Sequence, residues 1–215
     1  MIDLIYWDFM TDRFPYPELV RKLVDEFAKL PGIGKRSAER IAFHVLGKPR
    51  EEAMQLAMSI RDAKYGIKAC KICFNAADAD FCPVCLDKSR DTSLIAVVEL
   101  PRDILAFEKA CDYRGVYHVL QGTLRPADGI GFEQLRIQEL LERLKSAKVN
   151  EVILALNPTS DGDTTAAYLY NELIKTNVRI TRLARGLSTG TDLESVSPSS
   201  LRFAFISRRD WNESC

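Results

Sequence analysis

The 215-residue sequence lacks a net charge, because its 30 lysine and arginine residues are balanced by 30 aspartates and glutamates. Bulk charge therefore gives no indication of a polyanionic partner, and any such partner is expected to bind at a local site. The sequence also lacks an apolar run near the roughly 18 residues of a membrane-spanning helix. The stretch from Met1 to Asp12 lacks lysine and arginine, which is wrong for a secretory signal. We expect a cytoplasmic protein with no membrane partner.

Positive charge is present in excess in one short part of the chain. Residues 21–50 contain eight lysines and arginines but three acidic residues. A neutral chain with one basic segment favours a local polyanion site over a basic tail. The sequence therefore places a candidate nucleic-acid interface within this segment.

The hydrophobic pattern changes along the chain. Apolar residues at helical spacing predict helices over residues 17–30, 35–46 and 49–64. From residue 94 onward, apolar runs alternate with helical segments, an order typical of a parallel sheet with helical crossovers. We predict an α/β protein with a helical N-terminal region. Its strands are expected near residues 94–98, 115–120, 151–156 and 178–183, its helices near 102–111, 133–146 and 164–175, and a short final helix at Ser197-Pro198.

Two glycines, Gly32 and Gly34, lie in a sharp turn between the first two predicted helices. Glycine permits a positive φ and a close approach of the backbone to a ligand. The N-terminus of the following helix presents unpaired N–H groups to an anion. Lys35 and Arg36 add charge there, and Arg40 shares a helix face with Arg36. We predict that these five residues bind the phosphate backbone of DNA without reading its bases.

A simpler interpretation of this turn is a structural helix–helix corner with solvated charges. The full string Leu-Pro-Gly-Ile-Gly-Lys-Arg-x-Ala at residues 30–38, between two amphipathic helices, resembles the helix–hairpin–helix motif of DNA-binding proteins. This resemblance favours DNA contact over the structural corner. His44, on the second helix, is expected to be a structural histidine near the core.

Four cysteines, Cys70, Cys73, Cys82 and Cys85, form two Cys-x-x-Cys pairs separated by eight residues. Thiolates are soft ligands that suit Zn²⁺, and a closed site of four thiolates leaves no position for a substrate water. The stretch between the pairs is too short for a core of its own, so metal binding would supply folding free energy. We predict one structural zinc ion per chain; redox dithiols and an iron–sulfur cluster are the alternatives.

Acidic residues follow two of the predicted strands. Glu99 comes directly after residues 94–98, with Asp103 close behind, and Asp161-Gly162-Asp163 follows residues 151–156. Ligand sites of open α/β sheets lie beyond the carboxyl ends of the strands. We expect Glu99, Asp103, Asp161 and Asp163 to converge there, to hold Mg²⁺ or to present a negative patch to a partner. Solvated carboxylates at helix starts are the alternative.

This arrangement resembles the Toprim domain of topoisomerases, primases and some nucleases. The Toprim family implies a glutamate and an Asp-x-Asp pair that hold Mg²⁺ for phosphoryl chemistry. The sequence departs from that pattern, because Asn157-Pro158-Thr159 stands where Asp-x-Asp is expected. Asparagine and threonine lack the charge that Mg²⁺ requires in such a site, which weakens an enzymatic interpretation.

The order of these parts resembles the RecR family of bacterial recombination mediators over about residues 16–209. The resemblance implies an N-terminal extension (1–15), a helix–hairpin–helix region (16–66), a four-cysteine zinc finger (67–92), a Toprim domain (93–186) and a C-terminal Walker-B-like stretch with a helix (187–215). The stretches that carry it are residues 30–34, the four cysteines, and residues 113–120, 128–131, 157–159 and 190–194.

The RecR resemblance implies a non-catalytic protein of recombinational DNA repair in the bacterial cytoplasm, at the nucleoid. Such a protein acts with RecO, and in some bacteria RecF, to load RecA on gapped or single-stranded DNA, and forms a homodimer or a tetrameric ring. By position, Lys35, Arg36 and Arg40 would contact DNA, whether single-stranded, duplex or junction. The four acidic residues would form a face that meets RecO or a metal. The sequence has no Gly-x-x-x-x-Gly-Lys-Ser/Thr loop, so nucleotide hydrolysis is not expected.

Two other functions are compatible with the same motifs. The first is a Toprim-type, Mg²⁺-dependent nuclease or a primase-like enzyme, which would turn over nucleic acid and depend on Glu99. The second is an adaptor, stapled by zinc, that binds only protein. An assay for turnover tests the first, and DNA retention by an Arg36→Glu variant tests the second.

Overall fold

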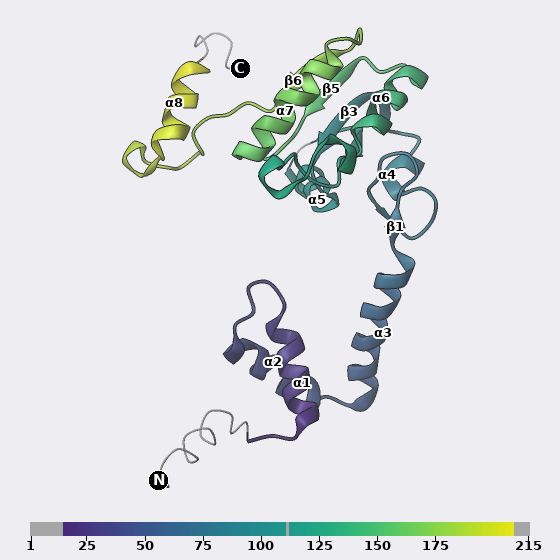
Figure 1. The fold of residues 1–215 in the computed structure, drawn as a ribbon, viewed down its shortest axis with the longest axis vertical. Coiled ribbons are helices and arrows are strands. Elements are labelled where there is room, and N and C mark those ends of the chain that lie inside the picture. Colours follow the sequence, from purple (N-terminus) through teal and green to yellow (C-terminus); the bar gives the residue numbers. More distant parts are fainter. Residues whose placement is uncertain (1–14, 111, 209–215) are drawn as a thin grey trace, which may run out of the picture. The chain divides into compact units, whose positions relative to one another are not determined.

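The computed structural model describes residues 15–110 and 112–208, which form two units divided between Tyr65 and Gly66 (Figure 1). Of the expected extension at residues 1–15, only Pro15 lies within the described part, and the predicted C-terminal part is described as far as residue 208. None of the described helices is both long enough and apolar enough to cross a membrane.

The first unit contains three helices, at the positions that hydrophobic periodicity predicts. They are α1 (Glu18–Ala28), α2 (Lys35–Leu46) and α3 (Arg50–Gly66). Val24 of α1 packs with Ala38 and Ala42 of α2 in a small buried cluster. α3 has no buried residue. Within the described residues, the buried core of this unit comes from α1 and α2.

The second unit begins with a small cysteine-containing knuckle. Its strands β1 (Lys68–Ala69) and β2 (Ala76–Ala77) pair antiparallel, and a short helix, α4 (Pro83–Leu86), follows. Two hydrogen bonds attach this knuckle to the sheet that comes next: the Val119 N–H donates to the Cys73 carbonyl at 2.8 Å, and the Gln121 side-chain amide donates to the Phe74 carbonyl at 2.6 Å. The knuckle and the sheet therefore fold as neighbours within one unit.

A four-stranded parallel sheet forms the centre of the second unit, which confirms the predicted α/β class. The strand order is β4-β3-β5-β6, and Ile95 of β3 pairs with Val116 of β4 and Val152 of β5. The strands are β3 (Asp91–Val98), β4 (Gly115–Val119), β5 (Glu151–Leu154) and β6 (Arg179–Arg182), and the crossover helices are α5 (Pro101–Ala110), α6 (Ile137–Ser146) and α7 (Ser160–Leu173).

Alternating side chains of β3 supply two separate cores. Ile95 and Val97 pack with Leu140 of α6 and Leu169 of α7 on one face of the sheet. On the other face, Ala96 and Val98 belong to a second core, which contains Ile104 of α5 and is contacted by Phe74 and Val84 of the knuckle. Helices α6 and α7 thus cover one face, while α5 and the knuckle cover the other (Figure 1).

Two crossover helices begin at other residues than expected. The helix expected from 133 starts at Ile137, after a short 3-10 turn at Phe132–Gln134. The helix expected from 164 starts at Ser160, because the Thr159 hydroxyl caps it by accepting a hydrogen bond from the Gly162 N–H at 3.1 Å. This earlier start places Asp161 and Asp163 in the first turn of α7.

The chain beyond β6 runs without regular structure to a 3-10 turn at Leu193–Ser195 and then to α8 (Pro198–Ile206). The Ser197 hydroxyl caps α8 by accepting a hydrogen bond from the Ser200 N–H at 3.1 Å. Pro198 occupies the first helical position, where its missing N–H costs nothing. The short terminal helix predicted from Ser197-Pro198 is confirmed.

Candidate functional site

The turn between α1 and α2 has an open backbone. Gly32 has a φ of +80°, a conformation that favours glycine, whereas Gly34 is extended with a φ of −79°. No described atom lies within 4 Å of where a Cβ would stand on either glycine. Gly32 is therefore needed for its conformation, while Gly34 leaves space beside the first N–H groups of α2. An anion approaching these N–H groups meets no side chain at Gly34.

The three predicted cations follow this opening, within the first two turns of α2. Lys35, Arg36 and Arg40 are all exposed, and none of them forms an ion pair with another described residue. Lys35 and Arg36 lie in the first turn of α2, at the positive end of the helix dipole. Free cations at this end of a helix attract an anion, since no carboxylate in the described part neutralises them.

The expectation that His44 is a structural histidine near the core is wrong. The side chain is exposed, because Ala38 and Ala42 face the core and a helix turns His44 away from both. His44 instead lines a surface hollow with Ser37, Arg40 and Ile41. The sequence could have indicated this position, because His44 is four residues after Arg40 and therefore lies on the same face of the helix.

The four cysteines form the one group of three or more potential metal ligands found among the described residues. Their sulfur atoms all lie within 4.8 Å of one another, and the Cys73 and Cys82 sulfurs are 3.5 Å apart. A tetrahedral zinc ion with Zn–S bonds of about 2.3 Å requires sulfur atoms about 3.8 Å apart. Cys70, Cys73 and Cys82 are buried and Cys85 is half-buried, so the cluster is closed to substrate.

The electrostatics of the cluster also suit a cation. Burial acts to raise the pKa of the Cys70 thiol, but the backbone N–H groups of Cys73, Cys82 and Ile72 outweigh it and lower the pKa to about 7. The pKa of Cys73 is raised, first by its contact with the Cys85 thiol and then by burial. Thiolates packed this closely repel one another unless a metal ion lies between them. The donor set therefore fits a structural zinc ion.

The acidic residues predicted to converge are not brought together as one ligand set among the described residues. Glu99 is buried at the end of β3, where its carboxylate accepts the Asn157 N–H and the Asn157 side-chain amide, each at 2.7 Å. Asp103 accepts the Leu100 N–H at 2.8 Å and so stabilises the start of α5. Asp161 is exposed in the first turn of α7.

Asp163 has cationic partners that the sequence did not indicate. Arg185 donates to both of its carboxylate oxygens, and Arg182 also donates to it. These contacts, with Arg185 first, lower the pKa of Asp163 to about 2. A carboxylate bound to two guanidinium groups is a poor additional ligand for Mg²⁺. Arg182 and Arg185 come from β6 and the segment after it, which sequence spacing alone could not place beside α7.

Gly162 allows the first turn of α7 to pack closely against Asn157 and Glu99. A Cβ at this position would stand 2.1 Å from the Asn157 carbonyl oxygen and 3.1 Å from a Glu99 carboxylate oxygen. Only glycine fits here, because the Asn157 backbone approaches the first turn of α7 so closely. The Asp-Gly-Asp sequence thus has a packing role in addition to any role of its charges.

Known protein families match both units. Residues 20–64 match the family described as "RecR, helix-hairpin-helix", and residues 93–184 match the Toprim domain. A "Recombination protein RecR" from Moorella thermoacetica is 50% identical over 196 residues, covering 91% of this chain and 98% of the relative. Proteins of the same name from Chloroflexus aurantiacus and Dehalococcoides mccartyi are 48% and 46% identical over 191 and 192 residues, covering 89% of this chain and 94% of each relative.

The chain belongs to the RecR family. Recombination protein RecR is the name that these relatives carry, so the RecR resemblance on residues 30–34, the four cysteines and the later motifs is confirmed as membership. The RecR parts follow in the expected order: helix–hairpin–helix, four-cysteine cluster, Toprim sheet and C-terminal helix. This RecR chain is accordingly a protein of recombination and recombinational repair.

Proposed function

We propose that this chain is a non-catalytic DNA-binding recombination mediator whose α1–α2 turn binds the phosphate backbone. The supporting observation is the set of exposed cations Lys35, Arg36 and Arg40, without carboxylate partners in the described part, in the first two turns of α2. Gly34 leaves the adjacent N–H groups open to an anion. Contacts of this kind hold the backbone and carry no base specificity.

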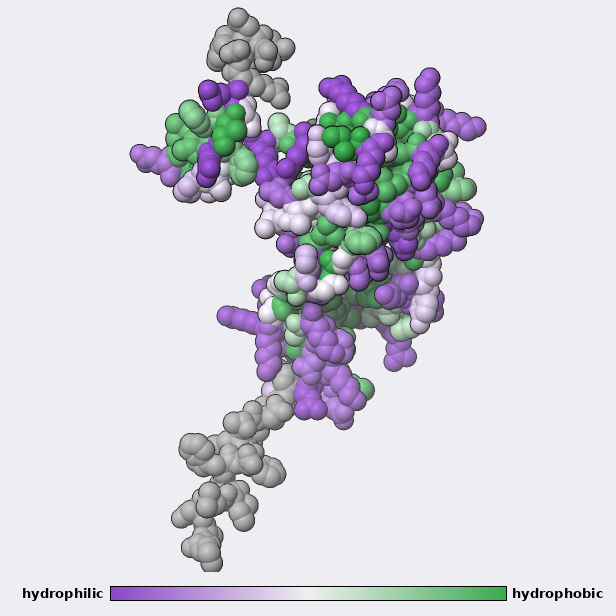
Figure 2. Space-filling model, turned by 45° about the horizontal axis from the view of Figure 1, so that its top comes forward, coloured by the Kyte–Doolittle hydropathy of each residue, from purple (hydrophilic) through white to green (hydrophobic). Residues whose placement is uncertain are grey.

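A homo-oligomer is part of the proposal. α3 exposes Met54, Leu56, Ile60 and Tyr65, of which Ile60 is 61% and Tyr65 86% accessible. The apolar residues of α8 also lie at the surface, where Figure 2 shows them at the upper left. Exposed apolar side chains of this kind are typical of surfaces that a second copy covers. A dimer or ring would place several α1–α2 turns on one DNA and raise their effective concentration.

The acidic end of the sheet is proposed as the docking face for RecO, with RecF as a further partner and RecA loading as the result. Asp161 supports this proposal, because it is exposed and no cation is paired with it in the described part. The Glu99 and Asp163 carboxylates already have partners within the chain, so we assign the RecO contact to Asp161. Asp161→Asn should weaken RecO capture in a pull-down, whereas retention equal to wild type would remove Asp161 from the contact.

The non-catalytic part of the proposal is supported by Glu99. In the Toprim enzymes that the sequence resembles, this glutamate would act with nearby aspartates on a metal. Here both carboxylate oxygens accept hydrogen bonds from Asn157, and Glu99 belongs to no group of three or more potential metal ligands in the described part. The chain would then bind nucleic acid without cutting or extending it.

The experiment that tests DNA binding compares two lysines. Lys35 lies at the start of α2, whereas Lys22 lies on α1 and is paired with Glu18 at 2.8 Å. Lys35→Gln and Lys22→Gln remove the same charge, so bulk electrostatics are matched. We expect Lys35→Gln to weaken binding of a labelled oligonucleotide in fluorescence anisotropy. The slope of log binding constant against log salt concentration should become shallower in this variant. The change is about 0.9 on duplex DNA, or about 0.7 on a single strand, for each phosphate that the variant no longer neutralises.

Two outcomes would contradict this proposal. One is a binding constant that does not change with salt, because phosphate contacts release counterions. The other is equal loss of affinity in Lys35→Gln and Lys22→Gln, which would assign the effect to net charge rather than to the turn. Arg36→Gln and Arg40→Gln extend the comparison to the other two cations.

A further inference from the structure

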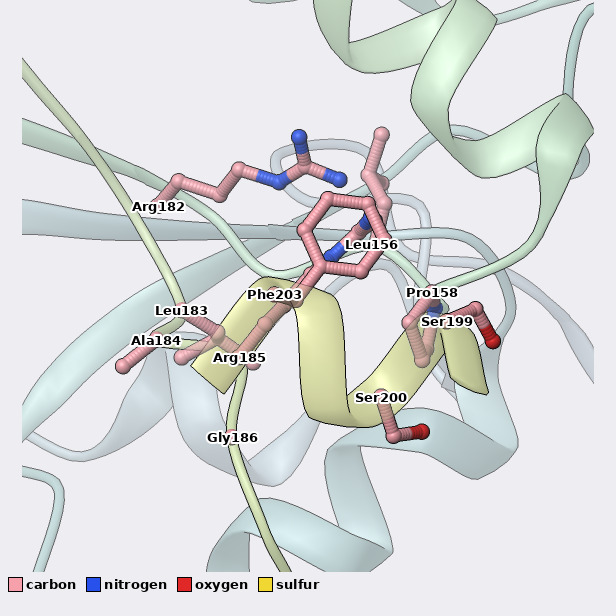
Figure 3. A pocket seen from close by; sticks show the side chains of 10 residues that line it. All are labelled: Leu156, Pro158, Arg182, Leu183, Ala184, Arg185, Gly186, Ser199, Ser200 and Phe203. Atoms are coloured by element: carbon pink, nitrogen blue, oxygen red, sulfur yellow. The ribbon is translucent and has the colours of Figure 1, made fainter. Parts of the chain in front are cut away.

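A cavity of about 350 Å³ lies between the carboxyl end of the sheet and α8 (Figure 3). Leu156 and Pro158, which follow β5, form one part of its wall, and Phe203 of α8 forms another. This volume is within the range of small-molecule sites in proteins. The RecR-type DNA contact proposed above uses α2 and does not involve this cavity.

The charged groups that line the cavity are all positive. Arg182 and Arg185 are its charged lining residues, and Ser199 and Ser200 add hydroxyl groups from the first turn of α8. Asp163, which pairs with both arginines, is not among the lining residues. One carboxylate faces two guanidinium groups, so the cluster keeps an excess of one positive charge beside an open space.

The two arginines have different roles in the cavity. Arg185 is held firmly, because its side chain is 17% exposed, it donates to both Asp163 oxygens, and its guanidinium lies 5.0 Å from the centre of the Phe203 ring. Arg182 is 40% exposed and uses one terminal nitrogen on Asp163. Its remaining N–H groups have no partner in the described part, and Figure 3 shows the side chain extending toward Phe203.

We propose that this cavity is a binding site for a phosphate group, held by Arg182 and by the first turn of α8. A guanidinium group binds phosphate through parallel N–H donors. The α8 N-terminus contributes its dipole and the Ser199 backbone N–H, because Pro198 has no N–H and the Ser200 N–H is already capped by Ser197. A phosphate placed there contacts both the sheet and α8, so binding fixes α8 against the sheet.

The experiment measures phosphate-dependent protection of α8. Trypsin cleaves after Arg202 when α8 opens, and the rate is followed by mass spectrometry on the full chain. Inorganic phosphate is compared with chloride at equal ionic strength, and phosphate is expected to slow this cleavage saturably. Cleavage that is equally fast in phosphate and in chloride would overturn the proposal.

Three variants locate the binding site. Arg182→Gln leaves Asp163 paired with Arg185, so the fold is retained, and the phosphate affinity is expected to fall about tenfold to a hundredfold. Arg179→Gln is the matched control, because Arg179 lies on the same strand and is 74% exposed. Ser199→Glu adds a carboxylate that favours the α8 helix start but repels phosphate, so protection should be lost.

Equal protection in Arg182→Gln, Ser199→Glu and wild type would overturn the assignment of the site. Lys35→Gln separates this site from the DNA contact on α2, since α8 protection should persist in that variant. Two sources of phosphate are then compared by replacing inorganic phosphate with adenosine monophosphate or with a 5′-phosphorylated oligonucleotide. Protection by the mononucleotide assigns the site to free nucleotides, and protection by the oligonucleotide alone assigns it to DNA.

Discussion

Asn157 donates two hydrogen bonds to the Glu99 carboxylate, one from its backbone N–H and one from its side-chain amide, each 2.7 Å long. The two residues follow β3 and β5, which are neighbours in the sheet, so the carboxyl ends of these strands bring them together. The side-chain amide of asparagine supplies a donor that an ionised aspartate at this position lacks. Two N–H groups of Asn157 therefore stabilise the Glu99 carboxylate.

The first prediction concerns catalysis at this pair. Labelled DNA or RNA incubated with the protein and Mg²⁺ or Mn²⁺ should remain intact. Asn157→Asp should destabilise the fold by about 1–3 kcal/mol, because it removes a donor and places two carboxylates together. Mg²⁺ should restore part of this loss by binding both carboxylates. Thermal unfolding with and without Mg²⁺ measures the effect.

Asn157→Ala is the control for this prediction. It removes the side-chain donor without adding a carboxylate, so its melting temperature should not respond to Mg²⁺. A metal-dependent turnover that Glu99→Gln abolishes would instead establish the Toprim-enzyme alternative.

The second prediction concerns the cysteine cluster. Cys82→Ser should release the zinc ion and lower stability by several kcal/mol, because metal binding supplies folding free energy in small sites of four cysteines. A colorimetric chelator assay should find one zinc ion per wild-type chain. Cys111→Ser is the control, because Cys111 lies outside the two Cys-x-x-Cys pairs of the sequence, and this variant should retain the zinc ion. Full zinc content in Cys82→Ser would show that Cys82 is not a ligand.

The third prediction concerns the two glycines of the α1–α2 turn. Gly32→Ala should destabilise the fold by about 1 kcal/mol, because Gly32 has a φ of +80° that an L side chain rarely adopts. Gly34→Ala should leave stability nearly unchanged, since its φ is −79° and its surroundings are open. Chemical denaturation compares them. A larger stability loss for Gly34→Ala than for Gly32→Ala would contradict this geometry.

The two glycines should also differ in DNA binding. Gly34→Ala places a methyl group beside the N–H groups that are proposed to meet phosphate, so it should weaken DNA binding despite its normal stability. This combination separates a binding role from a folding role. DNA affinity in Gly34→Ala equal to that of wild type would show that no phosphate approaches the turn at this point.

The fourth prediction concerns pH. His118 is fully buried, and its Nε2 lies 2.6 Å from the Arg136 carbonyl oxygen, to which it donates; Nδ1 is buried with no hydrogen-bond partner in the described part. Burial, opposed by the Arg136 carbonyl and reinforced by the nearby Arg143, lowers the pKa of His118 to about 4. Below the unfolded pKa of about 6.5, the unfolded chain binds a proton that the folded chain does not.

Stability from His118 is therefore complete above about pH 6.5 and is lost as pH falls toward 4. The free energy of unfolding should drop by about 2 kcal/mol more in wild type than in His118→Gln between pH 7.5 and 5. Urea titrations at the two pH values measure it, and the difference between the proteins removes the pH dependence of zinc binding. The same pH dependence in both proteins would mean that His118 titrates alike in the folded and unfolded chain.

Local sequence patterns were sufficient for much of the fold. Apolar spacing located α1 and α2, because a helix with one buried face repeats every 3.6 residues. The continuous apolar run at residues 94–98 indicated a central parallel strand, since β3 is buried on both faces. Helix starts were less well predicted: α7 begins at Ser160, four residues before the expected start, because Thr159 caps it. Capping depends on side-chain geometry that periodicity does not contain.

The sequence by itself determined the RecR order of parts, the set of four cysteines and the cations of the α1–α2 turn, because each depends on neighbours within a few residues. The tertiary structure alone decided which charges are free. It paired Asp163 with Arg182 and Arg185, and Glu99 with Asn157, across separations of 19 to 58 residues. Parallel strands bring such distant segments to one end of the sheet, and no local pattern records which of their side chains then meet.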